Sequence, residues 1–456
     1  MKRTLSTIFM ICIIAAAGFT LHKVTLNRTS QGCIQLNDFY HLPEDTVDLL
    51  CIGSSHVYYS IHTCRLYDRY GIAGYLLASP GQPVWLSYYF LEEALKTQSP
   101  QLLIFDVCTL YRKESSAGSA SWPSLISMKP SVAKWKAIRA VNWQEKQLDS
   151  VGAFFSFPYY HTRYAQLDRQ DYENTKKIRY NGYFPSFDRI SESELADWKQ
   201  IDRSNFHKSE PVSEQTELYF RKLIELCREK NIPLLLVNAP YLNQTEEKQK
   251  AYNYISQIAK EYGIPFLDCS YIDEIRIDYA KDLLEPSHLN YYGSMKYTDY
   301  LAEWISKYYT LPDRRENSRY QIWEETSRKF RHVELYGRAL KQIDTLEDYR
   351  KALRSLDECV VVLYQNPGGK SAVYENGKQV FAGAQGTDYF WHTDLGYSDL
   401  AVQCVSGNLT VSIDNEAYSY VNQGLNILVY DKVAKCVIDG AGFDVQTGKA
   451  VREKNM

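Results

Sequence analysis

The sequence lacks several features that indicate particular classes of protein. Its 456 residues carry a formal net charge of −3, so no basic surface for a nucleic acid is expected. Its ten cysteines include no CxxC pair and no Cys/His cluster with the spacing of metal ligands. We therefore predict no metal site, no cofactor and no disulfide framework. One isolated bridge, such as Cys33 with Cys64, stays open.

Long apolar runs are also scarce, and the single candidate lies at the N-terminus. Lys2 and Arg3 precede an apolar run, Leu5–Leu21. As a helix, this run would span roughly 26 Å, just short of the ~30 Å hydrocarbon core of a bilayer. We expect residues 1–24 to form a membrane anchor, with a signal peptide cut after Ala15–Ala17 as the alternative. Either way the remaining chain is expected outside the cytoplasm, at the cell membrane, or secreted if cleaved.

What the composition does contain is tyrosine, with 38 copies. Tyrosine combines apolar area with a polar tip, so this excess suits a hydrated recognition surface as well as a core. The length allows two or three domains, and 45% hydrophobic residues are typical of globular proteins.

Short apolar runs alternate with amphipathic patterns over residues 40–310. Buried strands are predicted over 47–52, 72–77, 102–106, 233–238 and 264–268. Helices are predicted over 84–96, 214–230, 246–262 and 292–308. Continuous apolar strands that alternate with helices favour a parallel sheet covered on both faces. We therefore predict an α/β domain with a five-stranded parallel sheet.

Other regions interrupt or follow this pattern. Residues 112–210 form an insertion too long for a simple loop, and we expect a helical cap over the sheet edge. Charged residues over 311–340 indicate a helical linker. Residues 341–456 contain short β-rich runs separated by turns, which predict an antiparallel domain resembling a β-sandwich.

Two polar clusters follow strands of the predicted sheet, where ligands of α/β proteins bind. Ser55 lies in the Gly-Ser-Ser-His turn after the first strand, and its hydroxyl can act as a nucleophile. Glu285 lies three residues before His288 and can orient the imidazole that takes the serine proton. Each cluster alone is also compatible with helix capping. Their order along the chain favours a catalytic serine.

This order resembles the SGNH/GDSL hydrolase superfamily. The segments Cys51–His56 and Ser287–Gly293 are most similar to its exported branch, related to DltD and AlgX-type proteins. The resemblance implies that Ser55 is the nucleophile, that His288 is the general base and that Glu285 orients it.

The resemblance also implies an oxyanion hole formed by the backbone N–H groups of Ser55 and Gly81. Two positions depart from the family pattern. Glu285 replaces an aspartate and is one methylene longer, so its hydrogen bond can be shifted or lost. Asp106 follows the third strand where an asparagine is expected, and an ionised carboxylate cannot donate. Losing one oxyanion donor typically costs ~2.7–4 kcal/mol of transition-state stabilisation.

Four further residues are candidates for substrate contact. We expect His56 to line the pocket or cap the turn, because neighbours at a helix start diverge and it is poorly placed as the base for Ser55. Asn290 can contact substrate or cap the last helix. His161 and Arg163, in the insertion, can contact a polar substrate, although such runs are commonly packing.

The C-terminal domain is similar to ILEI/PANDER-like domains. The similarity rests on the strand Gly424–Asp431 and on Phe443-Asp444, after which Val445 replaces the family threonine. It implies a compact β-sandwich with a glycan- or protein-binding role, with a structural appendage as the alternative.

Together the resemblances imply an exported, membrane-anchored serine esterase or O-acyltransferase for acyl esters of cell-surface or exported polysaccharide. Hydrolysis and transfer differ only in whether water or a sugar hydroxyl attacks the acyl-serine, so the motifs do not separate them. The expected partners are an acylated polysaccharide or other surface glycan and a membrane-bound acyltransferase. The alternative is a non-catalytic cell-envelope protein that binds glycan or protein on the same scaffold, which Glu285 and Asp106 favour.

Overall fold

The computed structural model describes residues 30–112, 118–141, 149–155, 157–166, 180–198, 207–444 and 446–452, with scattered positions between 7 and 21. Most of the predicted anchor or signal segment therefore lies outside the described residues. No helix among those described is both long and apolar enough to cross a membrane. The chain divides into two compact units, Met1–Glu324 and Glu325–Met456.

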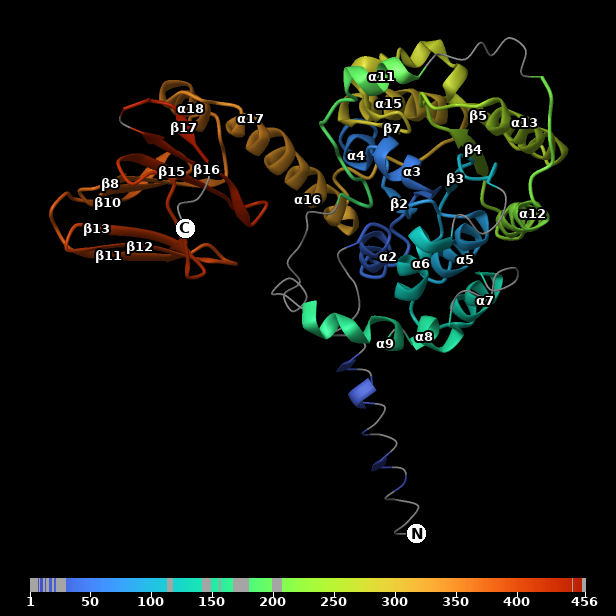
Figure 1. Ribbon diagram of the computed structural model, residues 1–456, viewed down its shortest axis with the longest axis horizontal. Helices are drawn as coiled ribbons and strands as arrows, with labels where there is room; N and C mark the ends of the chain where they lie inside the picture. The colour runs from blue at the N-terminus through green and yellow to red at the C-terminus, as the bar shows by residue number, and fades with distance from the viewer. Residues whose placement is uncertain are drawn as a thin grey trace. The chain divides into compact units, whose positions relative to one another are not determined.

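The first unit is built around the predicted five-stranded parallel sheet, with the order β2-β1-β3-β4-β5 (Figure 1). The strands are β1 Leu49–Gly53, β2 Gly74–Ala78, β3 Leu102–Asp106, β4 Leu234–Asn238 and β5 Phe266–Asp268. All residues of the first four strands are buried, which explains their continuous apolar sequence. Because β1 pairs with β2 on one side and β3 on the other, the strand order reverses at β1. Ligands of open α/β sheets bind at such a reversal.

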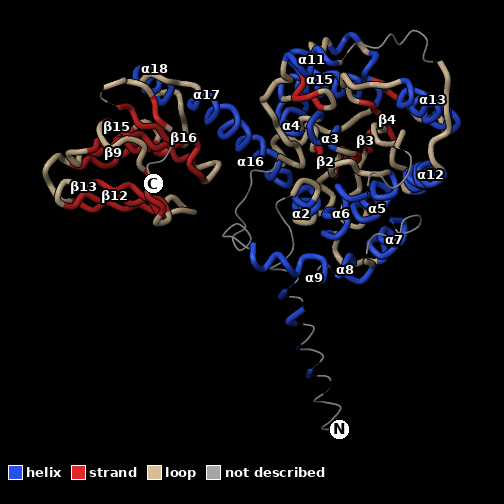
Figure 2. The backbone as a smooth tube through the Cα atoms, in the orientation of Figure 1, coloured by secondary structure: helices blue, strands red, loops and turns tan. Residues whose placement is uncertain are grey.

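Helices surround this sheet (Figure 2). The main ones are α2 Cys33–Phe39, α3 Ser55–Ser60, α4 Thr63–Tyr70, α5 Val84–Ala94, α12 Glu214–Glu229, α13 Glu246–Glu261 and α15 Tyr291–Tyr308. Alternate strand side chains such as Ile52 and Phe105 share one core with Phe90 of α5 and Phe220 of α12. Cys51 points to the other face, near Tyr297 of α15. Both faces are covered, as the alternating pattern predicts.

Cys33 and Cys64 are buried thiols and form no bridge.

The insertion contributes short helices and an extended segment. Its helices are α6 Gly118–Ser127, α7 Val132–Val141, α8 Ser150–Phe155, α9 Phe157–Tyr160, the 3₁₀ helix η2 His161–Gln166 and α11 Glu192–Asp197. Leu125 of α6 and Ile138 of α7 join the core of the sheet. The N–H of Leu76 in β2 donates to the carbonyl of Asn181 over 3.0 Å, so the insertion covers the exposed edge of the sheet.

The second unit is a pair of antiparallel sheets that resembles a sandwich, with strand orders β10-β9-β8-β15-β16-β17 and β11-β12-β13-β14. Its strands are β8 Cys359–Asn366, β9 Lys370–Glu375, β10 Lys378–Gly383, β11 Tyr389–Asp394, β12 Asp399–Val405, β13 Asn408–Ile413, β14 Glu416–Tyr418, β15 Gly424–Asp431, β16 Cys436–Asp444 and β17 Ala450–Val451. Val362 and Leu428 of the larger sheet pack against Val402 and Val411 of the smaller. A second core lies around Tyr349 of α18 Leu346–Leu353.

The division between the units falls inside α16 Gln321–Phe330, within the segment 311–340 that was expected to be a helical linker. Specific contacts tie the preceding residues to the first unit. The guanidinium of Arg314 donates two hydrogen bonds of 2.8 Å to the carboxylate of Asp48. Trp323 is fully buried, and its indole N–H donates to the carbonyl of Gly74 over 3.1 Å. Charge composition alone does not distinguish such a packed segment from a solvated linker. α16 continues into a π-helical turn, Arg331–Gly337, and α17 Arg338–Lys341.

Candidate active site

Ser55 stands at the sharp turn between β1 and α3. Ser54 caps α3, and its hydroxyl accepts the N–H of His56 at 3.4 Å. Ser55 is therefore the first helical residue, at the carboxyl edge of the sheet. Gly53 makes the turn possible, because a Cβ there would lie 2.9 Å from Cβ of Asp106 and 2.6 Å from the Val57 side chain.

Glu285 and His288 lie on a small hairpin formed by β6 Leu283–Glu285 and β7 His288–Leu289, in which they pair directly. The turn of the hairpin is held by the loop after β4. The N–H groups of Leu242 and Asn243 donate to the carbonyl of Pro286 over 2.9 and 3.1 Å. Two distant segments therefore fix the position of the His288 ring.

The structure brings Ser55, His288 and Glu285 into one continuous chain of hydrogen bonds. Nε2 of His288 lies 2.7 Å from Oγ of Ser55. Nδ1 of His288 is hydrogen-bonded to Oε1 of Glu285, and Oε2 accepts the N–H of Ser287 at 2.9 Å. Burial opposes ionisation of Glu285, but the hydrogen bonds from His288 and Ser287 outweigh it and lower its pKa. The longer glutamate keeps the orienting bond. Such an arrangement can activate a serine hydroxyl.

Two backbone donors are available at the carboxyl edge of the sheet. Within the described part of the chain, no acceptor is recorded for the N–H of Ser55 or of Gly81. Gly81 has φ 59°, a conformation that favours glycine. The next residue, Gln82, holds this turn in place: its side chain bonds Ser79 and Ser87, each at 2.9 Å.

Asp106 stands where the third donor is expected, and its carboxyl can donate only when it is protonated. Its carboxylate accepts the N–H of Cys108 at 3.0 Å, and the side chain is buried behind Gly53. Burial raises the pKa of Asp106 to about 7. The ionised form, as expected from the sequence, can only accept hydrogen bonds.

His56 is buried next to the hydrogen-bonded chain without joining it. Its ring lies edge-on to Tyr241, with centroids 5.0 Å apart, and 5.1 Å from the ring of His288. Burial, reinforced by the positive groups of His288, Lys248 and Arg112, lowers the pKa of His56 well below its ordinary value. His56 is therefore a neutral side chain that lines the site.

The remaining candidates lie in other environments. Asn290 is buried and caps α15: its Oδ1 accepts the N–H groups of Tyr292 and Gly293, while Nδ2 donates to three backbone carbonyls. Its hydrogen bonds are made within the fold, which is the capping role expected as one of its two alternatives. His161 and Arg163 follow α9, on a part of the domain remote from α3 and β7 (Figure 1). Arg163 lies near Cys33 of α2. The structure does not bring this pair to Ser55.

Sequence reasoning missed several residues around the site, namely Tyr59, Arg112, Tyr241, Asn243 and Lys248. Tyr59 packs on His288, with ring centroids 4.9 Å apart. Asn243 donates to the Ser287 hydroxyl over 2.6 Å. The sequence contained one signal for Arg112 and Lys248. Arg112 lies in a loop after a strand, and Lys248 lies in the first turn of a helix that follows a strand. No group of metal-ligating side chains occurs among the described residues.

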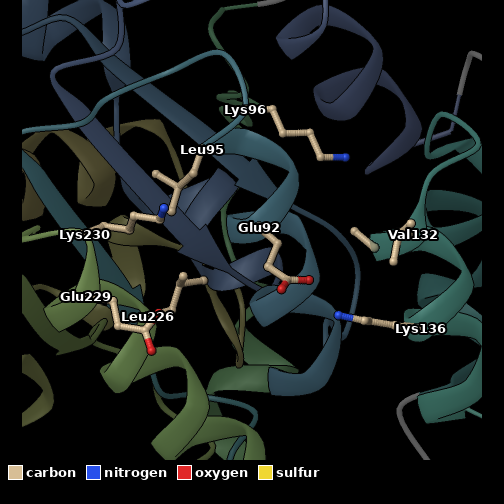
Figure 3. A pocket seen from close by; sticks show the side chains of 9 residues that line it. Glu92, Leu95, Lys96, Val132, Lys136, Leu226, Glu229 and Lys230 are labelled. Atoms are coloured by element: carbon tan, nitrogen blue, oxygen red, sulfur yellow. The ribbon is translucent and has the colours of Figure 1, made fainter.

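A cavity of about 530 Å³ lies elsewhere in the unit (Figure 3). It lies between α5, α7 and α12, with Glu92, Lys136 and Glu229 in its lining. α5 leads from the carboxyl end of β2 back to the amino end of β3, so its C-terminal residues lie at the sheet edge opposite to Ser55. The charged lining shows no nucleophile paired with a base.

Comparison with solved structures finds similar chains. The chain is similar to a protein from Bacteroides fragilis assigned as an acylhydrolase, with 13% identity, a TM-score of 0.30, and coverage of 60% of this chain and 94% of that one. It is also similar to a GDSL-like lipase from Bacteroides thetaiotaomicron, with 12% identity, a TM-score of 0.29, and coverage of 59% and 95%. Each similarity covers about 60% of this chain and nearly the whole of the other. No protein-family model and no curated protein sequence matches.

Proposed function

We propose that this chain is an exported, membrane-anchored serine esterase or O-acyltransferase that acts on acyl esters of cell-surface or exported polysaccharide. The observation that carries the chemistry is the hydrogen-bonded chain from Glu285 through His288 to Ser55. Export and anchoring are supported by the apolar run that follows Lys2 and Arg3.

In the proposed reaction, Oγ of Ser55 attacks the ester carbonyl while Nε2 of His288 takes the hydroxyl proton. The N–H groups of Ser55 and Gly81 stabilise the oxyanion. The carbon–oxygen bond to the alcohol then breaks, and His288 returns the proton to the leaving oxygen. Water or a second hydroxyl then attacks the acyl-serine and gives its proton to His288. The bond from the acyl carbon to Oγ of Ser55 breaks, His288 returns the proton to Oγ, and an acid or a new ester leaves. Glu285 stabilises the imidazolium at each transfer.

The acyl acceptor decides between esterase and transferase. A membrane-bound acyltransferase is the proposed partner for the transfer reaction, because an anchored enzyme would receive acyl groups at the membrane.

The C-terminal unit, which we propose to be an ILEI/PANDER-like module, would hold glycan or protein. This role is supported by Phe390, which is 67% exposed, and by the stacked ring of His392 beside it on β11.

Labelling with a fluorophosphonate probe tests the proposal. We expect the full chain to be labelled at Ser55, as located by mass spectrometry, and Ser55→Ala to lose the label. The neighbouring serine gives a matched control: Ser54→Ala should cost about 1 kcal/mol of helix capping but keep the label. An unlabelled, folded wild-type chain would contradict a catalytic role.

Asp106 favours a second candidate function, a non-catalytic cell-envelope protein that binds glycan or protein. With a carboxylate in place of a donor, the site has one oxyanion contact fewer than the family pattern. In this case we expect no labelling of Ser55 and glycan or protein binding that survives Ser55→Ala. Retained labelling at Ser55 together with ester turnover would exclude this candidate.

A further inference from the structure

Two basic side chains lie near His56, the residue after the proposed nucleophile, and the reaction described above uses neither. Arg112 is six residues beyond the end of β3. Its Nη1 lies 3.0 Å from the point where a Cβ on Gly81 would stand, so glycine leaves room for the guanidinium at this turn. The guanidinium therefore lies against the backbone that carries the proposed oxyanion donor.

Lys248 reaches the same site from the first turn of α13. Its Nζ donates to the carbonyl of Asn243 over 2.7 Å, and the Asn243 side chain bonds Ser287, the residue before His288. The ammonium also lies over the rings of Tyr111 and Tyr241, at 5.2 and 5.0 Å from their centroids. Tyr241 in turn packs against His56, so a continuous set of contacts links Lys248 to both histidines.

Within the ranges that the structure describes, neither Arg112 nor Lys248 has an ion-pair partner. The carboxylates of the proposed site are engaged: Glu285 accepts from His288 and Ser287, and Asp106 accepts from the backbone.

The position of Lys248 is itself unfavourable. A cation in the first turn of a helix opposes the helix dipole. Burial lowers the pKa of Lys248, and the nearby guanidinium of Arg112 acts in the same direction. Both effects would be relieved by a bound anion, because each cation would then gain an opposite charge in a partly buried site.

We propose that Arg112 and Lys248 form an anion-binding subsite next to Ser55, and that the substrate is an ester carrying a carboxylate or phosphate group near the scissile bond. This inference rests on the proposed function, since it names the substrate class of the same site. The planar guanidinium can bind two oxygens of such a group, and the ammonium adds a point charge. The same recognition serves an anion on the acyl part or on the alcohol part of the ester.

Inorganic phosphate is the first probe, in two measurements on the full chain. Calorimetry measures its binding directly, and protection against a neutral fluorophosphonate measures its effect at Ser55. We expect phosphate to bind and to protect, and Arg112→Gln or Lys248→Met to weaken both by about tenfold or more, the effect of losing one hydrogen bond to a charged group. Lys248→Arg keeps the charge and should retain both.

Matched controls come from basic residues that also lie over aromatic rings but far from Ser55. Lys222 lies 4.8 Å from the Tyr219 ring, and Arg139 lies 4.8 Å from the Trp135 ring. Lys222→Met and Arg139→Gln should leave phosphate binding and protection unchanged. Equal losses in these controls, or full binding in folded Arg112→Gln and Lys248→Met, would overturn the assignment.

The two measurements separate failure of the subsite from failure of the proposed function. Labelling of Ser55 without phosphate binding or protection overturns the subsite and leaves the esterase standing. Phosphate binding that depends on Arg112 and Lys248, without labelling, supports the subsite and overturns the esterase. Neither labelling nor binding overturns both.

Two pairs of esters then locate the anion. Para-nitrophenyl succinate and butyrate have acyl chains of equal length and differ in a terminal carboxylate. Acetyl esters of methyl glucuronoside and methyl glucoside place the same difference on the alcohol. We expect one pair to show kcat/KM higher for the anionic ester by about tenfold or more, after subtraction of the Ser55→Ala rate, and to lose this ratio in Arg112→Gln. A preference for the neutral ester in both pairs would overturn the proposal.

Discussion

Replacing Glu285 by glutamine tests the reasoning about the site most directly. The carboxylate has two acceptor oxygens, and both are used: one by Nδ1 of His288 and one by the N–H of Ser287. Glutamine has nearly the same shape but one acceptor oxygen, and its other terminal atom is a donor. One of the two contacts must therefore become unfavourable.

The two orientations of the amide have different costs. If its oxygen faces Ser287, the NH₂ group donates to Nδ1, which leaves the proton on Nε2 of His288. That tautomer cannot take the proton of Ser55, and in serine hydrolases the wrong tautomer lowers kcat by about 10⁴-fold. If the oxygen faces His288, the N–H of Ser287 meets a donor and costs about 1–3 kcal/mol, or roughly 5- to 150-fold in the population of the productive arrangement.

We therefore expect Glu285→Gln to lower kcat on a para-nitrophenyl ester by about 10- to 10⁴-fold, with a smaller effect on KM. Glu285→Asp, which restores the family residue, is the control and should retain more activity than the glutamine variant. The assay combines steady-state kinetics with the rate of fluorophosphonate labelling. The reasoning is refuted if Glu285→Gln keeps kcat within about twofold while Ser55→Ala abolishes turnover.

Three further predictions concern stability and roles. The pKa of Asp106, raised to about 7, means that the folded chain favours the protonated carboxyl. The stabilisation from this group is therefore complete at a pH below the ordinary aspartate pKa, and it falls by about 1.4 kcal/mol per pH unit up to about pH 7. Asp106→Asn should accordingly raise the melting temperature at pH 8 more than at pH 5; an equal shift at both would contradict the assignment. Gly53→Ala should cost about 1–3 kcal/mol of unfolding free energy in denaturant titrations and slow labelling of Ser55, and a wild-type titration curve would show that the turn tolerates a Cβ. Asn290→Ala should lower the unfolding free energy by about 1–2 kcal/mol with little change in KM, whereas a large rise in KM would assign Asn290 to substrate contact.

Hydrophobic patterning identified the elements of the α/β unit closely. The third strand was predicted at 102–106 and lies there, and the fourth helix pattern, 292–308, differs from α15 by one residue. These elements are buried on both faces or along one face, so the sequence period follows the environment directly. The hairpin of β6 and β7 escaped prediction. It is only a few residues long, and its position depends on bonds to Pro286 from the loop after β4.

The sequence could not show that Arg112 and Lys248 lie close together in space. Arg112 and Lys248 are separated by more than a hundred residues and belong to no family motif. Their neighbourhood depends on two separate crossovers that end at the same edge of the sheet. His161 and Arg163, whose polar character suggested substrate contact, lie in η2, and Arg163 is near Cys33 of α2.

The sequence by itself determined the type and order of the elements, because strand burial is written in consecutive residues, and two short motifs pointed to the serine, histidine and carboxylate through a family resemblance. The tertiary structure decided three things. It decided that Glu285, despite its extra methylene, reaches His288 within the hairpin of β6 and β7; that Asn290 caps α15; and that Arg112 and Lys248 both lie near His56. The last of these depends on atoms from segments far apart in the chain, whose distances arise only when the strands pair and the helices pack.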